Sequence, residues 1–456
     1  MKRQVIKYLL LCSIVGLCYN TAISQSPTHD ARMYDIIKAV DADRIEKDIR
    51  TLANFGTRHT LSDTLSETRG IGAARRWIKK EMDQISADCG GCLDVFYHKG
   101  LVKAGESRRI PNDTWIVNVV AVKRGTVYPD RYVIMSGDID SRISDPLNGT
   151  DDSPGANDNA SGMAGVIEAA RVLSKYDFPS SVALVGLSGE EQGLFGGKFL
   201  AATAKEENWD IVAVLNNDMI GNISGIDGVV DNTTFRVFSE PAPPKQTEQQ
   251  QIWNRFYGGE VDGPSRQVAR YVERMTSTYM TNLTAKMIYR LDRFGRGGHH
   301  RPFNDEGFPG VRIMETHENY NRQHQDIRTE NGIAYGDVIE GVNFEYAAKL
   351  TAVNAICLAG MAWAPPPPPL VMIGGAVKAS TTLQWDAVED TNLLGYKVYW
   401  RDTTAPQWQY SKWVGKETKA VLENIVIDNF LFGVTAIGKH GNESVVAYPR
   451  TFIPRR

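Results

Sequence analysis

The sequence predicts an α/β protein with a mostly parallel central sheet flanked by helices, followed by a C-terminal all-β sandwich. Three observations support this fold class. Apolar strand-like runs alternate with helix-like segments as far as residue 363, a run of five prolines then interrupts the pattern, and short strand-like runs separated by turn residues follow it. Alternating strands and helices are typical of parallel α/β sheets, and short strands at regular spacing are typical of β-sandwiches.

The strands of the first region are predicted from six apolar runs: WIVNVVAV, RYVIMSG, SVALVGL, IVAVLNND, AKMIYRL and VRIME. Two helix-like stretches lie within residues 42–86, and further helices are predicted over 161–176, 265–279 and 337–361. In the helix at 161–176, apolar residues recur with the 3.6-residue period of one helix face. Residues 225–262 are polar and form a long insertion, which we expect to act as a lid or a substrate-facing loop.

Length and charge restrict the classes of function. The chain has 456 residues, which is long for one hydrophobic core, so two domains are expected. The net charge is −3 and the hydrophobic fraction is 42%, both ordinary for a soluble globular protein. This balance argues against nucleic acid as a partner and against a polybasic membrane-binding patch.

The N-terminus has the pattern of an export signal. Basic residues in MKRQVIK precede an apolar stretch, and AIS at 22–24 is a small-x-small cleavage pattern. Such a segment is too short to span a membrane as a mature helix. The alternative is a lipoprotein signal that ends at Cys18, but Leu17 fits it poorly because a small residue is expected there. We therefore expect a signal peptide at 1–24 and an exported mature protein, periplasmic or secreted, without a membrane span.

The proline run marks the domain boundary. Residues 364–369 read APPPPP, a stiff polyproline linker about 15 Å long. It separates a first domain at 25–363 from a module at 370–456, whose pattern resembles a fibronectin type III β-sandwich. The module carries no catalytic cluster, so we expect a spacer or adhesive module that contacts a protein or glycan partner. Its core is predicted to contain Trp385, Tyr396, Trp400 and Phe432.

Three cysteines remain once the predicted signal is removed. Cys89-Gly-Gly-Cys92 could be a redox motif, half a zinc site or a local disulfide. No second cysteine pair exists to complete a zinc site, and an oxidising compartment favours the disulfide. Cys357 lies in an apolar helical run and is predicted to be a buried free thiol.

Acidic residues follow the predicted strands where each strand ends. They are Asp138, Asp158, the pair Glu190-Glu191, and Asp218, and a further loop reads GGHHRPF. The carboxyl ends of parallel strands meet at one edge of a sheet, so these side chains are expected to lie close together. Carboxylates brought together repel one another unless a cation lies between them. Carboxylate and imidazole ligands suit Zn²⁺, with Mn²⁺ or a similar ion as the alternative.

The segments GANDNASG, SGEEQGLFGG, NNDMIGN and GHHRPF resemble, in this order, the exported zinc aminopeptidases of the bacterial leucyl aminopeptidase and aminopeptidase Y type. That family includes glutaminyl cyclases as relatives. The resemblance covers roughly residues 42–360. It implies a phosphorylase/hydrolase-like zinc exopeptidase fold with a pair of metal ions, and it makes residues 25–363 a metallopeptidase catalytic domain. The implied function is an exported metallo-aminopeptidase that hydrolyses N-terminal residues from peptides.

The resemblance also implies roles for single residues. Asp158 would bridge two metal ions, Glu191 and His300 would complete the ligands of one ion, and Asp218 would bind the other. Glu190 would be the general base. It would take a proton from a water molecule activated by the metal, and this water would attack the scissile carbonyl.

Two histidine-containing segments leave alternatives open. His300 is preferred as the ligand because the family places its histidine three residues before a phenylalanine, here Phe303. His299 is then either a supporting group or an alternative ligand. The segment METHENYNRQHQDIR is given equal weight as part of the substrate pocket or as a surface loop; its polar residues are Glu315, His317, Tyr320, His324 and Asp326.

One position departs from the family pattern. Family members have His-x-Asp-Ser at the end of this strand, whereas this chain reads DIDS from Asp138. The second metal would then see Asp138, Asp158 and Asp218, an all-oxygen set that favours Mn²⁺, Mg²⁺ or Ca²⁺ over zinc. A dizinc site, a mixed-metal site and a single zinc are the three outcomes, of which we expect two bound metals. Asp140 loses its usual imidazole partner, and Arg142 is expected to neutralise it.

Two other classes of function compete with the aminopeptidase. One is a glutaminyl cyclase or another amidohydrolase, but the segment Glu191-Gln-Gly-Leu resembles peptidases. The other is a non-catalytic binding protein, which the altered Asp138 and the C-terminal module favour. The presence of Glu190 argues against it, because a protein that only binds has no use for a general base.

Overall fold

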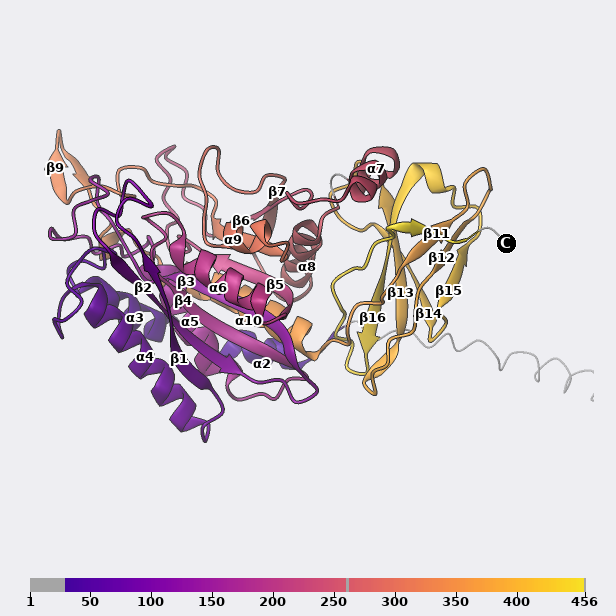
Figure 1. Cartoon of the computed structure of the whole chain (residues 1–456), viewed down its shortest axis with the longest axis horizontal. Helices are drawn as coiled ribbons and strands as arrows, with labels where there is room; N and C mark the ends of the chain where they lie inside the picture. The colour runs from indigo at the N-terminus through magenta and orange to yellow at the C-terminus, as the bar shows by residue number, and fades with distance from the viewer. Residues whose placement is uncertain (1–28, 260–261, 455–456) are drawn as a thin grey trace, which may run out of the picture.

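The computed structural model describes residues 29–259 and 262–454, so the predicted signal peptide at 1–24 lies outside the described residues. A larger α/β region and a smaller all-β region lie side by side, joined through the last helix of the first region (Figure 1). This arrangement confirms the predicted fold class. Within the described ranges, none of the helices has the length and apolar character needed to cross a membrane.

The larger region is built on an eight-stranded sheet of order β1-β2-β4-β3-β5-β8-β6-β7. Its middle strands β4, β3, β5 and β8 are parallel, while β1 and β2 add to one side in antiparallel fashion and β6 runs antiparallel to β8. The bounds are β1 (Asp94–Val102), β2 (Thr114–Lys123), β3 (Tyr128–Asp138), β4 (Ser180–Leu187), β5 (Asp210–Asn217), β6 (Thr234–Ser239), β7 (Thr284–Ile288) and β8 (Gly310–Glu315).

All six predicted strands are confirmed, and β1 and β6 are additional. The sequence signal of β1 is weak because it is an edge strand whose residues are mostly half-buried. A separate two-stranded hairpin, β9 (Arg328–Glu330) and β10 (Ile333–Tyr335), projects from the same end of the molecule as the sheet's loops.

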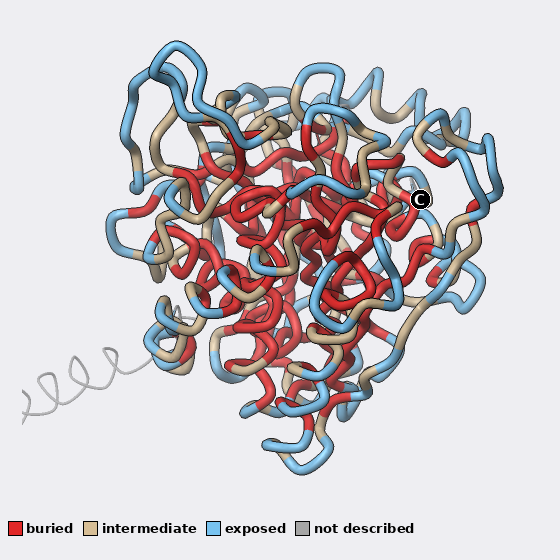
Figure 2. Tube along the Cα trace, turned by 90° about the vertical axis from the view of Figure 1, so that its left-hand side faces the viewer, coloured by how far each residue is buried: buried red, intermediate tan, exposed pale blue. Residues whose placement is uncertain are grey.

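Most helices of the larger region lie on the two faces of this sheet. The helices of this region are α2 (Arg32–Ala39), α3 (Ala42–Ala53), α4 (Gly70–Asp88), α5 (Ala160–Leu173), α6 (Phe195–Glu206), α7 (Glu248–Tyr257), α8 (Pro264–Tyr279), α9 (His300–Asp305) and α10 (Phe344–Trp363), with a 3-10 helix η2 (Ile339–Gly341) before α10. Side chains of α2, α3, α4, α5, α8 and α10 form the larger core on one face, and those of α6 and α9 form a smaller core on the other. Figure 2 shows the buried segments filling the centre, with exposed loops around them.

Small residues let α5 approach the sheet closely. A Cβ atom placed on Gly137, at the end of β3, would lie 2.7 Å from the carbonyl carbon of Gly162 in the first turn of α5. Gly137 is also the register partner of Asn217 on β5. Because the backbones meet here, the loop before α5 is held against the carboxyl ends of β3 and β5.

The predicted insertion at 225–262 is not a single loop. Part of it, β6, pairs with β7 and β8 in the main sheet. Another part, α7, packs on the C-terminal region, where the rings of Trp253 and Tyr257 lie 5.1 Å and 4.9 Å from that of Phe452. The expectation of a lid is therefore wrong for these two segments, because both are occupied in packing.

The C-terminal region has a four-stranded sheet, β15-β12-β11-β17, and a three-stranded sheet, β14-β13-β16. Their bounds are β11 (Met372–Gly374), β12 (Thr381–Gln384), β13 (Leu393–Asp402), β14 (Tyr410–Gly415), β15 (Lys419–Leu422), β16 (Phe430–Gly438) and β17 (Thr451–Phe452), with a 3-10 helix η3 (Ile427–Asn429). Trp385, Tyr396 and Phe432 are buried in its core as predicted, and Trp400 is partly buried against it. The resemblance to fibronectin type III stays a prediction.

The C-terminal region is docked on the first region rather than tethered to it. Asp262 is buried and contacts Arg270 of α8 at 2.5 Å and Arg401 of β13 at 2.8 Å. Arg274 of α8 pairs with Glu443 at 2.7 Å. Buried ion pairs need fixed geometry to offset the cost of desolvation, so these contacts mark a defined interface. The expectation of a spacer on a stiff linker is corrected accordingly.

The cysteine predictions are confirmed. Cys89 and Cys92 form a disulfide just after α4, with Cα atoms 5.6 Å apart. Cys357 is a buried free thiol within α10.

Candidate metal centre

Five acidic residues lie at one edge of the sheet. Asp138 ends β3, Glu190 and Glu191 follow β4, Asp218 follows β5, and Asp158 stands two residues before α5. Four of these residues are buried and Glu190 is half-buried. The peptide bond that follows Asp158 is cis. The topology thus brings together the strand-end carboxylates that the sequence singled out.

Three of the side chains in this region form a ligand group. Atoms of Asp158, Glu191 and His324 all lie within 4.8 Å of one another. His324 Nε2 is 3.0 Å from Asp158 Oδ2 and 2.8 Å from Glu191 Oε1. In the described part of the chain this is the only group of three or more His, Cys, Asp or Glu residues placed to hold a metal ion.

This group fits zinc. Two carboxylates and an imidazole are ordinary zinc ligands, with metal–ligand distances of about 2.0–2.2 Å. Tetrahedral ligands at that distance lie about 3.3 Å apart, so the two contacts of His324 Nε2 need to lengthen by only a few tenths of an ångström. His324 also has a positive φ of 55°, a backbone conformation that non-glycine residues adopt rarely and that is enriched at functional sites.

Arg142 holds two members of the group. Its Nε donates to Glu191 Oε2 at 2.6 Å, and its Nη2 lies 2.6 Å from His324 Nδ1. A guanidinium can only donate, so Nδ1 accepts and the hydrogen of the neutral ring sits on Nε2, between the two carboxylates. Zinc binding at Nε2 would move that hydrogen to Nδ1 and require Arg142 to turn away from the ring.

The titration of His324 is governed by opposing effects. Burial lowers its pKa, but the charges of Glu191 and Asp158 outweigh burial and raise the pKa to about 9. In return, and against their own burial, His324 lowers the pKa of both carboxyls. The Arg142 contact opposes the imidazolium form, because that form would set two donors face to face at Nδ1. The two carboxylates therefore favour the charged ring, and the Arg142 contact favours the neutral one with its hydrogen on Nε2.

The structure does not bring His300 to Glu191, and this prediction needs correction. His300 begins α9, its side chain is fully buried, and its Nε2 donates to the carbonyl of Leu291 at 2.8 Å. Burial lowers its pKa to about 4, so the ring is neutral. Neither ring nitrogen of His300 belongs to the ligand group around Asp158 and Glu191. The position assigned to His300 is taken by His324, from the segment that the sequence left undecided.

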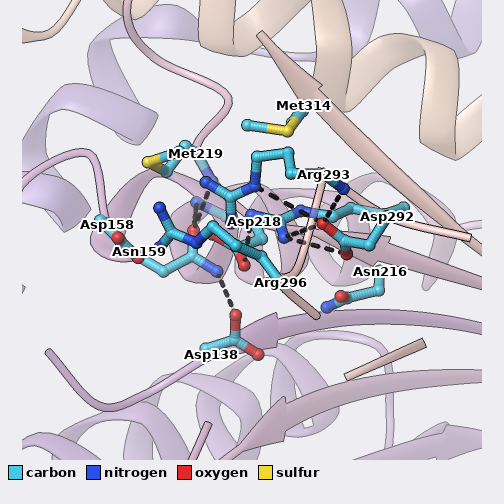
Figure 3. Close-up of polar contacts among 12 residues, drawn as sticks. Asp138, Asp158, Asn159, Asn216, Asp218, Met219, Asp292, Arg293, Arg296 and Met314 are labelled. Atoms are coloured by element: carbon cyan, nitrogen blue, oxygen red, sulfur yellow. Dashed lines mark hydrogen bonds and ion pairs between the residues drawn. The ribbon is translucent and has the colours of Figure 1, made fainter. Parts of the chain in front are cut away.

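His299 lies next to Asp138 instead. Its Nδ1 is 2.5 Å from Asp138 Oδ1, and burial lowers the pKa of the ring to about 4, so the neutral imidazole donates to the carboxylate. Asn159 donates to the other oxygen, Oδ2, at 2.8 Å (Figure 3). Both oxygens of Asp138 are thus engaged by protein donors.

Asp218 pairs with an arginine that the sequence analysis did not single out. Arg312 Nη2 lies 2.7 Å from Asp218 Oδ2, and Arg312 Nη1 lies 3.0 Å from Asp292 Oδ1. Arg312 is on β8 and its register partner Asn216 is on β5, two residues before Asp218. Strand pairing therefore sets this contact, and a single sequence offers no periodic signal for it.

Asp140 organises the turn that carries the two glutamates. Its Oδ1 accepts the backbone N–H of Glu190 at 3.2 Å, and its Oδ2 accepts that of Glu191 at 3.1 Å. Thr60 Oγ1 donates to the same Oδ2 at 3.1 Å. The expected neutralisation of Asp140 by Arg142 is corrected, because Arg142 pairs with Glu191.

The loop before α5 is fixed by two residues that the sequence reasoning missed. Asp337 accepts the backbone N–H of Asn157 at 2.9 Å and of Asp158 at 2.6 Å. Arg58 is fully buried and donates to the carbonyl oxygens of Ile139 and Gly155, both at 2.9 Å. Both contacts are long-range, so no local pattern could have identified them.

Burial raises the pKa of three of the acids. The pKa of Asp138 rises to about 8 and that of Asp218 to about 7, in each case chiefly by desolvation. For Glu190, burial and then the charge of Glu191 raise the pKa well above its ordinary value. These shifts show a surplus of buried negative charge at this edge of the sheet, which a cation would relieve.

Three other residues of the segment at 314–328 have structural partners. Glu315 accepts from Asn157 Nδ2 at 2.9 Å, Asp326 accepts from Ser144 Oγ at 2.8 Å, and His317 pairs with Asp227 at 2.7 Å. Only His324 of this segment enters the ligand group.

Similarity to known proteins decides the family. A probable zinc metalloprotease of Pyrenophora tritici-repentis is 40% identical over 430 residues, covering 94% of this chain and 88% of the relative. The chain belongs to peptidase family M28. Residues 118–339 match Peptidase family M28 itself. A probable zinc metalloprotease of Leptosphaeria maculans is 39% identical over 424 residues, covering 93% of the M28 chain described here and 98% of the relative.

Solved structures show the same fold at lower identity. LapB from Legionella pneumophila superposes with a TM-score of 0.53 at 18% identity, covering 74% of this M28 chain and 78% of LapB. The LapA aminopeptidase of the same organism gives a TM-score of 0.51 at 18% identity, covering 75% and 76% of the two chains. The similarity to the two probable zinc metalloproteases spans 94% and 93% of the chain, so it extends into the C-terminal β region.

Proposed function

We propose that this M28 chain is an exported zinc aminopeptidase that releases N-terminal residues from peptides, with Glu190 as the general base. One observation carries the proposal: Glu190 neighbours the ligand Glu191 on a turn that Asp140 fixes through both backbone amides. The printed names of the relatives support zinc and peptide hydrolysis. The aminopeptidase name of LapA, a protein of the same fold, supports removal of terminal residues.

Each residue then has a distinct task. Asp158, Glu191 and His324 would hold the zinc ion. When bound, zinc polarises the scissile carbonyl and makes a water molecule more acidic. Glu190 takes the proton of the attacking water and gives it to the leaving amine. Burial and then the charge of Glu191 raise the pKa of Glu190, which makes its carboxylate a stronger base.

The assay is release of product from a panel of aminoacyl arylamides by the mature, zinc-supplied protein, with N-acetylated analogues as controls. We expect turnover that is lost on acetylation, abolished by a chelator and restored by zinc. The Glu190→Gln variant is the matched control, because it keeps the shape of the side chain and removes the base. A zinc-loaded protein with no turnover on any arylamide would contradict the proposal and favour another amidohydrolase activity.

Export is proposed from the N-terminal pattern at 1–24. Expression of the full chain in a host with a secretory pathway, followed by N-terminal sequencing of the recovered protein, tests it. We expect a mature chain that begins at Gln25. An uncleaved chain that remains in the cytosol would contradict this part of the proposal.

A further inference from the structure

A buried arginine stands where the family resemblance leads one to expect a second metal ion. That ion would be held by Asp138, Asp158 and Asp218. In the structure, Arg312 Nη2 lies 2.7 Å from Asp218 Oδ2. The contact therefore puts a guanidinium on one of the two carboxylate oxygens of Asp218.

The position of Arg312 is fixed from several sides. Its Nη1 contacts both oxygens of Asp292, at 3.0 Å and 3.1 Å, and donates to the carbonyl of Gly297 at 3.1 Å. The side chain of Arg312 is fully buried, and Asp292 is nearly so. A guanidinium stays charged at all ordinary pH values, so Asp218 faces a permanent positive charge.

Asp138 is likewise committed to protein partners. His299 Nδ1 and Asn159 Nδ2 contact its two oxygens, at 2.5 Å and 2.8 Å. Asn159 is itself held in place, because it also donates to Asn217 O at 2.7 Å and accepts from the N–H groups of Gly162 and Met219. Turning Asp138 toward an ion would break contacts that tie three segments together.

Three buried ligand atoms here lack a hydrogen-bond partner: Asp218 Oδ1, His299 Nε2 and His300 Nδ1. They do not make a second ligand group, because the described residues contain no set of three ligand atoms that joins Asp218, Asp138 or His299 within 4.8 Å. The donors needed for a second ion are present in the sequence, but the structure holds them apart.

We infer that this enzyme binds one metal ion per chain, and that the guanidinium of Arg312 supplies beside Asp218 the positive charge that a second ion would otherwise supply. The inference rests on the proposed function for the first ion, held by Asp158, Glu191 and His324. It differs from the two-metal expectation of the family resemblance because of residues particular to this chain: Arg312, and Asp138 in place of a histidine.

The test counts metal ions and does not depend on turnover. The mature full-length protein is freed of metal with a chelator and titrated with Co²⁺, followed by visible absorbance, and zinc-loaded protein is analysed by mass spectrometry of the metal. We expect an endpoint at one equivalent. Asp218→Asn keeps an oxygen for Arg312 and is expected to bind one equivalent as well, whereas His324→Ala is expected to fall below about a tenth of an equivalent.

Two equivalents in the wild type, with loss of one in Asp218→Asn, would overturn the inference. Arg312→Met, checked for folding by circular dichroism, is expected to admit a second equivalent. A folded Arg312→Met that still binds one would overturn the role given to Arg312. Failure of the proposed function would give a different result. If the protein bound one equivalent of metal but hydrolysed no arylamide, only the proposed aminopeptidase activity would be refuted.

Discussion

Asparagine in place of Asp140 is expected to lower kcat/KM by about 10- to 100-fold without unfolding the protein. The buried carboxylate accepts one backbone N–H from Glu190 and one from Glu191. An asparagine offers one oxygen and one NH₂ group, so one of these N–H groups would face another donor. Losing a hydrogen bond to a charged group costs about 1.5–3 kcal/mol. A loss of this size in transition-state stabilisation corresponds to roughly one to two orders of magnitude in rate.

Thr60→Val is the matched control. The Thr60 hydroxyl donates to the same carboxylate at 3.1 Å but does not touch the glutamate turn. Its removal is expected to change kcat/KM by less than about threefold, because both backbone N–H groups of the turn keep their carboxylate acceptor. Both variants are assayed on the best arylamide at matched zinc content. If Asp140→Asn stayed within twofold of the wild type, Asp140 would not be what positions Glu190.

The remaining predictions concern catalysis, ligation and stability. Glu190→Gln is expected to keep bound zinc and to lose about 10²- to 10⁴-fold in kcat, and undiminished turnover would refute its role as base. His324→Ala is expected to lose zinc. His300→Ala is expected to keep zinc but to lose about 2–3 kcal/mol of stability, because its buried hydrogen bond to Leu291 is lost. Loss of zinc from His300→Ala and not from His324→Ala would restore His300 as the ligand. Asp48 is buried on α3, and burial raises its pKa to about 7. The folded state therefore binds the Asp48 proton more tightly than the unfolded state does. The free energy of unfolding consequently falls as pH rises from about 4 to 7. Asp48→Asn removes the cost of ionising the buried carboxyl, which is up to about 4 kcal/mol. The gain in Tm of this variant is therefore expected to be larger at pH 8 than at pH 5. An equal gain at both pH values would contradict the raised pKa of Asp48. Asp262→Ala leaves two buried arginines without their carboxylate and is expected to cost about 3–5 kcal/mol in urea unfolding; no change would mean that the C-terminal region is only loosely attached.

Local pattern was sufficient for most of the fold. Strands that are buried on both faces leave long apolar runs, and β2, β3, β4, β5 and β8 were all predictable from them. The same logic located Asp138, Glu190, Glu191 and Asp218, because an acidic residue at the end of a buried strand is conspicuous against its apolar neighbours. The disulfide between Cys89 and Cys92 was predictable for a similar reason, since both partners lie in one short segment.

The identity of the histidine ligand depended on tertiary structure. The chain has eight histidines, and three of them, His299, His300 and His324, lie in loops or loop-to-helix turns without a periodic pattern. Which one reaches Glu191 depends on how two long loops return to the sheet edge. Hydrogen bonds made far along the chain decide this, such as the one from Arg142 to His324.

The sequence alone also did not predict the positive charge of Arg312 beside Asp218 or the docking of the C-terminal region. Arg312 looks like an ordinary residue in an apolar strand until the register of β8 against β5 sets it beside Asp218. The proline run suggested a free spacer, yet Asp262 and two arginines join the regions across the fold. Secondary structure and local motifs depend on neighbouring residues and can be predicted from the sequence. Contacts between distant segments form only when the chain packs. The acidic residues at the sheet edge could therefore be predicted from the sequence. The ion pairs that these residues make with Arg142 and Arg312 depend on the tertiary structure.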